Sequence, residues 1–352
     1  MATLTRRKLI RSALASGVGG LFAPMLGSSW ARAEDKTLTA THFGGPYQVL
    51  RDIVAAPFKK AGLGDVAYDV EFSGAAIGKM QTQKDSPPFD VALLSRSFAI
   101  RAQNAGLVSK IEKASIAEAG NLVPDALPAA GWGAAMIMDT FDFMIDKNQI
   151  KMPVESWLDL WKPEFAGKLM LPAASNPATV FFIACVAKAA AGDEKSPKAI
   201  DEAFARLKAL KKSVRSYYSD ALQPTQLIER GEIAAAPQFG IRIANQSKKV
   251  PNIVKVTPKE GVVAIPYDLC VPVNSTKQEL ARTYINFTMR KDVQAALVDS
   301  LLATPVRSDV EVAPEIKSLV TTEFSKIWFA DEELIAAKQK EWLDRYMREV
   351  QS

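Results

Sequence analysis

Few residues of this 352-residue chain could do covalent chemistry. His42 is the only histidine, and no Gly-x-Ser-x-Gly sequence accompanies it. Catalytic sites of the Ser-His-Asp or Cys-His type and metal sites built from several histidines are therefore not expected. Catalysis by carboxylates alone is the one enzymatic route left open, although the acidic residues form no paired motif that would support it. We expect a protein that is not an enzyme and that needs no metal or cofactor.

One short stretch superficially suggests a phosphate-binding loop. Gly74-Ala75-Ala76-Ile77-Gly78-Lys79-Met80 has glycines and a lysine. It lacks the four-residue spacer of such a loop and the Ser or Thr after the lysine. A nucleotide is therefore not expected here.

The two cysteines, Cys185 and Cys270, both lie in apolar surroundings. There is no Cys-x-x-Cys pair, so redox catalysis has no support. A disulfide and two separate buried thiols both stay open, and the buried thiols are favoured.

Strands and helices alternate in the first third of the chain. Apolar runs of period two and helical runs of period 3.6 follow each other as strand, helix, strand, helix, strand, helix. This order indicates a parallel sheet with right-handed crossovers. The expected elements are strand 37–43, helix 47–61, strand 66–72, helix 75–83, strand 89–94 and helix 98–105.

A second α/β unit follows, bounded by two long apolar runs. The first run, 134–145, is broken by Asp139 and Asp142, and the second covers 262–273. Two α/β units joined by two crossing strands can close over a ligand by a hinge motion. The other expected elements are strand 168–171, helices 178–191 and 199–211, strand 214–218, helix 225–230, strands 233–238 and 252–256, and helices 278–302 and 332–350.

The N-terminal segment has the features of an export signal. Thr5-Arg6-Arg7-Lys8-Leu9-Ile10 resembles a twin-arginine export signal, and Ala31-Arg32-Ala33 fits a cleavage site. The apolar stretch between them is interrupted and shorter than the about 20 residues of a membrane span. We expect residues 1–33 to be a signal peptide and the mature protein to be periplasmic.

Removal of this segment changes the charge of the protein. Residues 1–33 hold five basic and no acidic residues, which leaves 39 Lys and Arg against 39 Asp and Glu. The excess of basic residues belongs to the signal. No nucleic acid partner is expected, since such a partner needs a basic field on the folded domain.

Several motifs resemble those of the substrate-binding proteins of bacterial ABC importers, in particular the spermidine/putrescine-binding family. Their order and spacing along the mature chain carry the resemblance. They are Phe43-Gly44-Gly45-Pro46-Tyr47, Pro153-Val154-Glu155-Ser156-Trp157-Leu158-Asp159-Leu160-Trp161 with Phe165-Ala166-Gly167-Lys168, Ile228-Glu229-Arg230-Gly231-Glu232-Ile233, and Pro258-Lys259-Glu260-Gly261 with Pro272.

The resemblance implies a type II periplasmic binding protein. This is an α/β fold of two lobes, each a mostly parallel sheet flanked by helices, joined by two crossing hinge strands. We expect an N-lobe of residues 34–138 and 267–310 and a C-lobe of residues 139–266. The lobe joined by the helical segment 311–352 stays open. The implied partners are a small-molecule ligand and an inner-membrane ABC permease, and the implied state is a monomer.

The resemblance and the ends of the strands together place the ligand-binding residues. Gly44 and Gly45 permit positive φ and close approach of the backbone, and Arg96 offers a bidentate fork for a carboxylate. Asn176 also suits a helix cap, and His42 a structural role. The candidate ligand-binding residues are Phe43, Gly44, Gly45, Tyr47, Ser95, Arg96, Ser175, Asn176, Thr179, Gln238, Phe239, Arg242, Tyr267 and Asp268.

Departures from the family pattern bear on the ligand. Ser175-Asn176-Pro177 lacks the acid expected there, and Gln238-Phe239 stands where a tryptophan would cage an ammonium group. We therefore favour a solute with a carboxylate, such as an amino acid, over a polyamine. A polyamine ligand, a role as a sensor and a ferric complex stay as alternatives. The pair Tyr217-Tyr218 resembles that of ferric-ion binders but precedes the Gly-Glu turn instead of following it.

Overall fold

The computed structural model describes residues 36–352, which form one compact unit. The expected signal segment 1–33 lies outside the described residues. No helix in 36–352 is long and apolar enough to cross a membrane. The strands are β1 Thr37–His42, β2 Asp65–Val70, β3 Ala92–Ser95, β4 Ala134–Asp146, β5 Leu169–Pro172, β6 Val214–Tyr218, β7 Ala235–Phe239, β8 Ile253–Val256, β9 Val262–Cys270 and β10 Ile327–Phe329.

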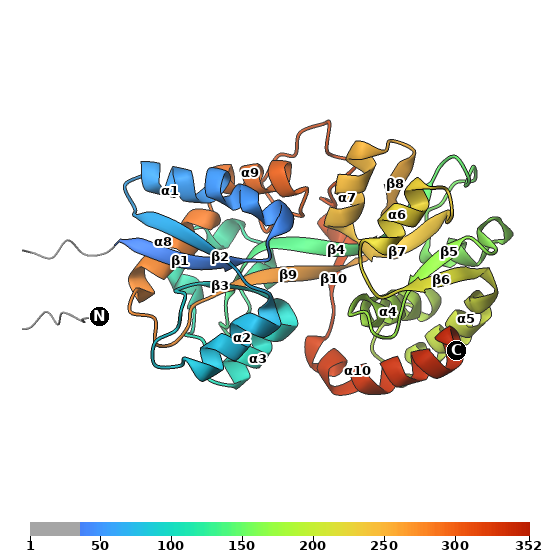
Figure 1. Ribbon diagram of the computed structural model, residues 1–352, viewed down its shortest axis with the longest axis horizontal. Coiled ribbons are helices and arrows are strands. Elements are labelled where there is room, and N and C mark those ends of the chain that lie inside the picture. The colour runs from blue at the N-terminus through green and yellow to red at the C-terminus, as the bar shows by residue number, and fades with distance from the viewer. Residues whose placement is uncertain (1–35) are drawn as a thin grey trace, which may run out of the picture. The chain divides into compact units, whose positions relative to one another are not determined.

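Helices pack around these strands (Figure 1). Local signals define their ends, as at α5, where the hydroxyl of Ser196 accepts the amide of Ala199 at 3.2 Å, and at α4, where Gly192 takes a left-handed φ of 73°. The helices are α1 Ala56–Lys60, α2 Ser73–Thr82, α3 Arg96–Asn104, α4 Ala178–Ala191, α5 Pro197–Leu210, α6 Gln223–Glu229, α7 Gly240–Lys249, α8 Gln278–Thr288, α9 Lys291–Leu301 and α10 Glu332–Tyr346.

Two halves are linked by the long strands β4 and β9, which run side by side between them (Figure 1). We call the half with β1–β3, α8 and α9 the N-lobe, and the half with β5–β8 and α4–α7 the C-lobe. Each has its own apolar core, around Phe58 and Tyr284 in the N-lobe and around Trp157 and Phe204 in the C-lobe. This is the expected two-lobed α/β fold. The exact residues at which the lobes divide remain a prediction.

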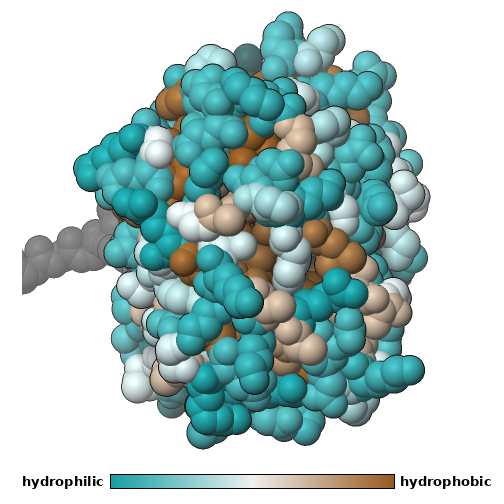
Figure 2. All heavy atoms as spheres, turned by 90° about the vertical axis from the view of Figure 1, so that its right-hand side faces the viewer, coloured by the Kyte–Doolittle hydropathy of each residue, from teal (hydrophilic) through white to brown (hydrophobic). Residues whose placement is uncertain are grey.

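The C-terminal helix α10 belongs with the C-lobe core. Its side chains Ile335, Trp342 and Tyr346 are buried there with those of α4 and α5. Figure 2 shows the C-lobe end of the molecule, where hydrophilic side chains dominate the surface and apolar atoms show between them. Burial of these three apolar side chains of α10 explains why the helix joins the C-lobe, a choice that the sequence did not decide.

The third expected strand has a different partner from the one predicted. β1 and β2 are parallel, with Thr37 opposite Asp65, as expected. Only Val91 continues this parallel order, through a single bridge to Ala40, and β3 itself runs antiparallel to β9. β10, which pairs in parallel with β9, was not predicted. A strand of three residues carries too little periodicity to be seen in a sequence.

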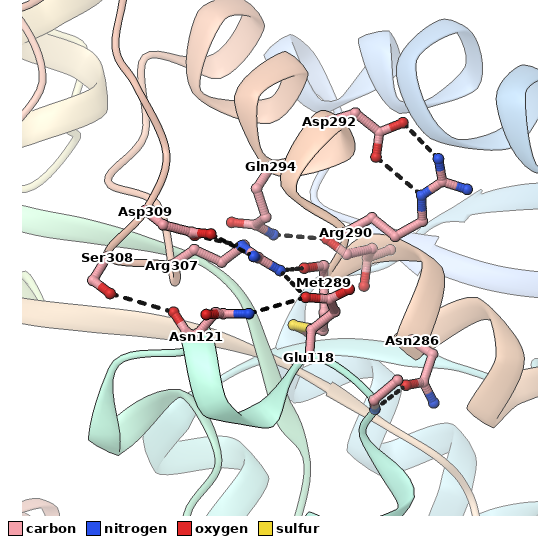
Figure 3. A network of polar contacts seen from close by, with 12 residues as sticks. Glu118, Asn121, Asn286, Met289, Arg290, Asp292, Gln294, Arg307, Ser308 and Asp309 are labelled. Carbon is pink, nitrogen blue, oxygen red and sulfur yellow. Dashed lines mark hydrogen bonds and ion pairs between the residues drawn. The ribbon is translucent and has the colours of Figure 1, made fainter.

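Two expected helices are interrupted. The predicted helix 47–61 is a 3-10 turn, a π turn and the short α1, because Pro57 has no N–H to donate to the residue four positions earlier. The predicted helix 278–302 breaks between α8 and α9, where Arg290 is extended at φ −63° and ψ 146°. The carbonyl of Met289 at this break accepts a hydrogen bond from Arg307 at 2.9 Å (Figure 3).

Candidate functional site

Four aromatic side chains meet at residues 43–47, which follow β1 and which we call the first loop. We call Phe43, Tyr47, Phe72 and Tyr267 the aromatic group. The ring of Phe43 lies 5.4 Å from Tyr47 and 5.2 Å from Tyr267, both edge to face, and 6.4 Å from Phe72. Phe72 is 66% exposed, so the group presents an aromatic face to solvent. Tyr267 also packs against both lobe cores, which places the group at the junction of the lobes.

The glycines of the first loop take conformations that other residues avoid. Gly44 has φ 73° and ψ −164°, a region that glycine alone occupies readily. A Cβ there would lie 3.1 Å from a methyl group of Val70. Gly45 has φ 54° and is exposed. The predicted need for glycine in this loop therefore has a backbone cause.

Arg96 and Asp268 are bound to each other. The guanidinium of Arg96 donates from Nε and Nη2 to the two carboxylate oxygens of Asp268, at 3.0 and 2.8 Å, and Nη2 also donates to the carbonyl of Asp125 at 2.9 Å. The indole of Trp132 donates to Asp268 at 3.1 Å. Both charged side chains are buried. The two N–H donors of Arg96 that were expected to bind a ligand carboxylate are therefore already hydrogen-bonded to Asp268.

A second buried carboxyl group lies on the crossing strand β4. Asp139 accepts the backbone amides of Thr140 at 2.8 Å and Ile241 at 2.9 Å, and its side chain is hydrogen-bonded to Tyr267. Burial raises the pKa of Asp139 to about 6. Because Ile241 belongs to α7 and Tyr267 to β9, this group ties the two crossing strands to the C-lobe.

Arg242 is the cation that faces the aromatic group. It is exposed on the first turn of α7, and its charge acts on the hydroxyls of Tyr47 and Tyr267, where it opposes the rise in pKa that burial causes. No carboxylate of residues 36–352 forms an ion pair with it. The geometry thus leaves Arg242, not Arg96, as the open guanidinium at the lobe junction.

The other C-lobe candidates are engaged within the protein. The side chain of Asn176 donates to the carbonyl of Ser219 at 3.0 Å and accepts the amide of Ala178 at 2.9 Å. Thr179 donates to the carbonyl of Ala173 at 2.6 Å. Gln238 donates to the carbonyl of Ala221 at 2.9 Å and is fully buried. These three hold the ends of strands and helices in place.

Three candidates remain. Ser175 is exposed, and Phe239 packs edge to face on Phe141 at 5.7 Å. Ser95 is opposite Tyr267 in the pairing of β3 and β9. The structure therefore brings together the first loop, Tyr267 and Arg242, and separately the pair of Arg96 and Asp268.

Four residues at the junction were not among the sequence candidates. They are Phe72, Trp132, Asp139 and Glu332. Asp139 could have been chosen from the sequence, because it is an acidic residue inside the long apolar run 134–145. Glu332 opens α10, and burial raises its pKa to about 7, while the charge of nearby Arg96 opposes this. Trp132 and Glu332 had no signal, because only the packing of distant segments brings them to Asp268 and Arg96.

Two cavities of the structure lie away from the candidate residues. One of about 980 Å³ in the C-lobe is lined by residues such as Ile150, Lys255 and Leu319, and none of the candidate residues lines it. Within the described residues no group of three or more His, Cys, Asp and Glu side chains could hold a metal ion. Cys185 and Cys270 are free and buried.

Known proteins resemble this chain over most of its length. It is 28% identical to the spermidine/putrescine-binding periplasmic protein of Escherichia coli K12, over 90% of this chain and 93% of that protein. It is 23% identical to the gamma-aminobutyric acid-binding protein of Pseudomonas aeruginosa PAO1, over 78% of each. A solved structure of an ABC transporter protein from Clostridium perfringens, 25% identical, superposes with a TM-score of 0.78 over 89% of this chain and 99% of that one.

The architecture is that of type II periplasmic binding proteins. Residues 86–326, more than half of the chain, match one protein family. Members of this family bind solutes for transporters and are not enzymes. The chain belongs to the bacterial extracellular solute-binding protein family.

Proposed function

We propose that this protein captures a small zwitterionic or carboxylate-bearing solute between its lobes, as the solute-binding component of an ABC importer. The carboxylate of the solute binds the guanidinium of Arg242, which can donate two parallel hydrogen bonds. The apolar part or an ammonium group of the solute lies on the aromatic group, by packing and cation–π contact.

The observation that carries this proposal is the internal pairing of Asp268 with Arg96. A polyamine needs carboxylates that are free to meet its ammonium groups, and Asp268 already has a cation at 2.8 Å. Arg242 has no such partner within residues 36–352. Arg242 is therefore an exposed cation at the junction that a solute can reach, which favours a solute with an anionic end.

The relatives include proteins named for each of the two ligand classes, polyamines and amino acids. One is named for spermidine and putrescine and another for gamma-aminobutyric acid, a molecule with one carboxylate and one ammonium group. An ω-amino acid satisfies Arg242 and the aromatic group together. A polyamine remains the second candidate, because Asp139 and the half-buried Glu332 could also meet an ammonium group.

The cellular setting is part of the proposal. We infer export by a twin-arginine signal in residues 1–33, a periplasmic location, a monomeric state and delivery of the solute to an inner-membrane permease. A role as a sensor would leave solute binding unchanged and differ only in the partner. A ferric complex has less support, since Tyr217 and Tyr218 donate to the carbonyls of Val350 and Pro237 at 2.5 and 2.7 Å.

Titration calorimetry with 4-aminobutyrate, putrescine and spermidine tests the proposal. We expect 4-aminobutyrate to bind more tightly than either polyamine. Arg242→Met should weaken its binding by about 100-fold, the size expected for a charge-assisted bidentate contact. Arg230→Met is the matched control, because Arg230 is an exposed arginine of the same lobe outside the junction, and it should bind like the unmodified protein.

Opposite results would overturn this assignment. Tight binding of putrescine with no binding of 4-aminobutyrate would show that the junction favours cations. Equal binding by Arg242→Met and Arg230→Met would remove Arg242 from the site.

A further inference from the structure

His42 lies directly before the first loop and is fully buried. Its ring nitrogen Nδ1 accepts the backbone N–H of Gly44 at 2.8 Å. An acceptor nitrogen carries no proton, so the neutral imidazole has its proton on Nε2. Within residues 36–352 this Nε2 is buried without a hydrogen-bond partner. A buried donor without a partner costs stability, and its presence calls for a reason.

The contact closes a small turn around Phe43. A side-chain acceptor that reaches the amide two residues later fixes the backbone between them, as in Asx turns. Here the fixed backbone includes the unusual conformation of Gly44, which a Val70 methyl group also borders. The turn therefore sets the direction in which Phe43 presents its ring to the aromatic group.

We propose that neutral His42 is a positioning residue of the solute site, which holds the first loop in its binding conformation and releases the loop, and with it the solute, on protonation at Nδ1. This inference rests on the proposed function. A proton on Nδ1 would face the N–H of Gly44, donor against donor, and the turn would open.

The surroundings of His42 set the direction of its titration. The groups that face it are the ring of Tyr68 on β2, at 5.5 Å between ring centroids, and the charge of Arg51. Neither carries a negative charge that would pair with an imidazolium. Burial, and after it the charge of Arg51, lowers the pKa of His42 below its usual 6.5. The loop is therefore ordered at neutral pH and opens only under acid conditions.

Because the sequence has a single histidine, nitrogen NMR of the protein reports His42 without ambiguity. We expect the Nε2–H tautomer at about pH 8 and a midpoint below about pH 6.5, with the Gly44 amide losing its protection from exchange over the same range. His42→Asn keeps an acceptor near the position of Nδ1 and cannot take up a proton. It should protect Gly44 at every pH, whereas His42→Leu should leave Gly44 unprotected.

Binding of 4-aminobutyrate completes the test. We expect affinity to fall about tenfold from pH 8 to pH 5 in the unmodified protein, the size of one lost hydrogen bond. His42→Asn should remove most of this dependence, and any part that persists belongs to Asp139 or Glu332, whose raised pKa values of about 6 and about 7 lie in the same range. His42→Leu should bind weakly at both pH values.

The outcomes separate the two proposals. An Nδ1–H tautomer, or a protected Gly44 amide in His42→Leu, would overturn the role of His42. A folded protein that binds no 4-aminobutyrate but shows the expected coupling of His42 and Gly44 would reject the solute class and support the positioning of the loop.

Discussion

At the scale of single residues, Asp139 shows how burial changes a carboxyl group. Its usual pKa near 4 is raised to about 6, although two backbone amides donate to it. A raised pKa means that the folded protein keeps a proton which the unfolded chain releases. The stability that Asp139 contributes is therefore full below about pH 4 and is lost as the pH rises through about 6.

Asp139→Asn should remove this loss. We expect the free energy of unfolding of the variant, relative to the unmodified protein, to rise by about 2–3 kcal/mol between pH 4 and pH 7. Urea unfolding across this range measures the difference. Asp146→Asn, on the same strand, is the control: hydrogen bonds outweigh burial and lower the pKa of Asp146, so its stability difference should stay nearly constant from pH 4 to pH 7 and change only at lower pH. A constant difference for Asp139→Asn would show that its pKa is not raised.

The pair of Arg96 and Asp268 illustrates a different residue-scale rule. Removal of one partner from a buried ion pair leaves an uncompensated charge. Arg96→Met should destabilise the protein by about 3–5 kcal/mol, because it leaves the carboxylate of Asp268 with the indole of Trp132 as its remaining partner. Denaturant unfolding gives the value.

A double variant, Arg96→Met with Asp268→Leu, checks the cause. It removes both charges and should recover most of the lost stability. If the double variant were as unstable as Arg96→Met alone, packing and not charge would explain the loss.

At the scale of elements, Arg307 joins three segments of the N-lobe (Figure 3). Its guanidinium donates to the carboxylates of Asp309 and Glu118 and to the carbonyl of Met289, at distances of 2.7–2.9 Å. The side chain is 3% exposed, while both acids are more than a third exposed. Arg307 therefore holds the break between α8 and α9 against its two neighbouring segments.

Arg307→Met should cost about 2 kcal/mol, less than Arg96→Met, because water can solvate the released acids. Arg290→Met is the matched control: Arg290 pairs with Asp292 at the same break, but on the surface, and should change stability by at most about 0.5 kcal/mol. Thermal and urea unfolding compare the two. Equal effects would mean that burial of Arg307 contributes nothing.

At the scale of the whole molecule, the two lobes are linked by the crossing strands β4 and β9, so closure of the lobes over a solute can be tested. A solute that bridges Arg242 and the aromatic group binds the closed arrangement in preference to an open one. At 100 times its dissociation constant it should stabilise the protein by about 2.7 kcal/mol. Small-angle scattering should show a smaller radius of gyration with 4-aminobutyrate than without it.

Arg242→Met should show neither change under the same conditions. A rise in melting temperature without a change in radius would mean that the solute binds lobes that are already closed.

The sequence by itself determined most of the succession of elements, because periodicity and caps are local. Strand 214–218 and helix 178–191 match β6 and α4 residue for residue, and the two long apolar runs are the crossing strands. The glycine requirement at Gly44 was equally visible, since it follows from backbone conformation. Only the tertiary structure decided which polar groups stay open. Arg96 and Arg242 look alike in the sequence, and one of them is neutralised by Asp268, 172 positions away. The pairing of distant charges depends on how strands and helices pack, and no local pattern records it.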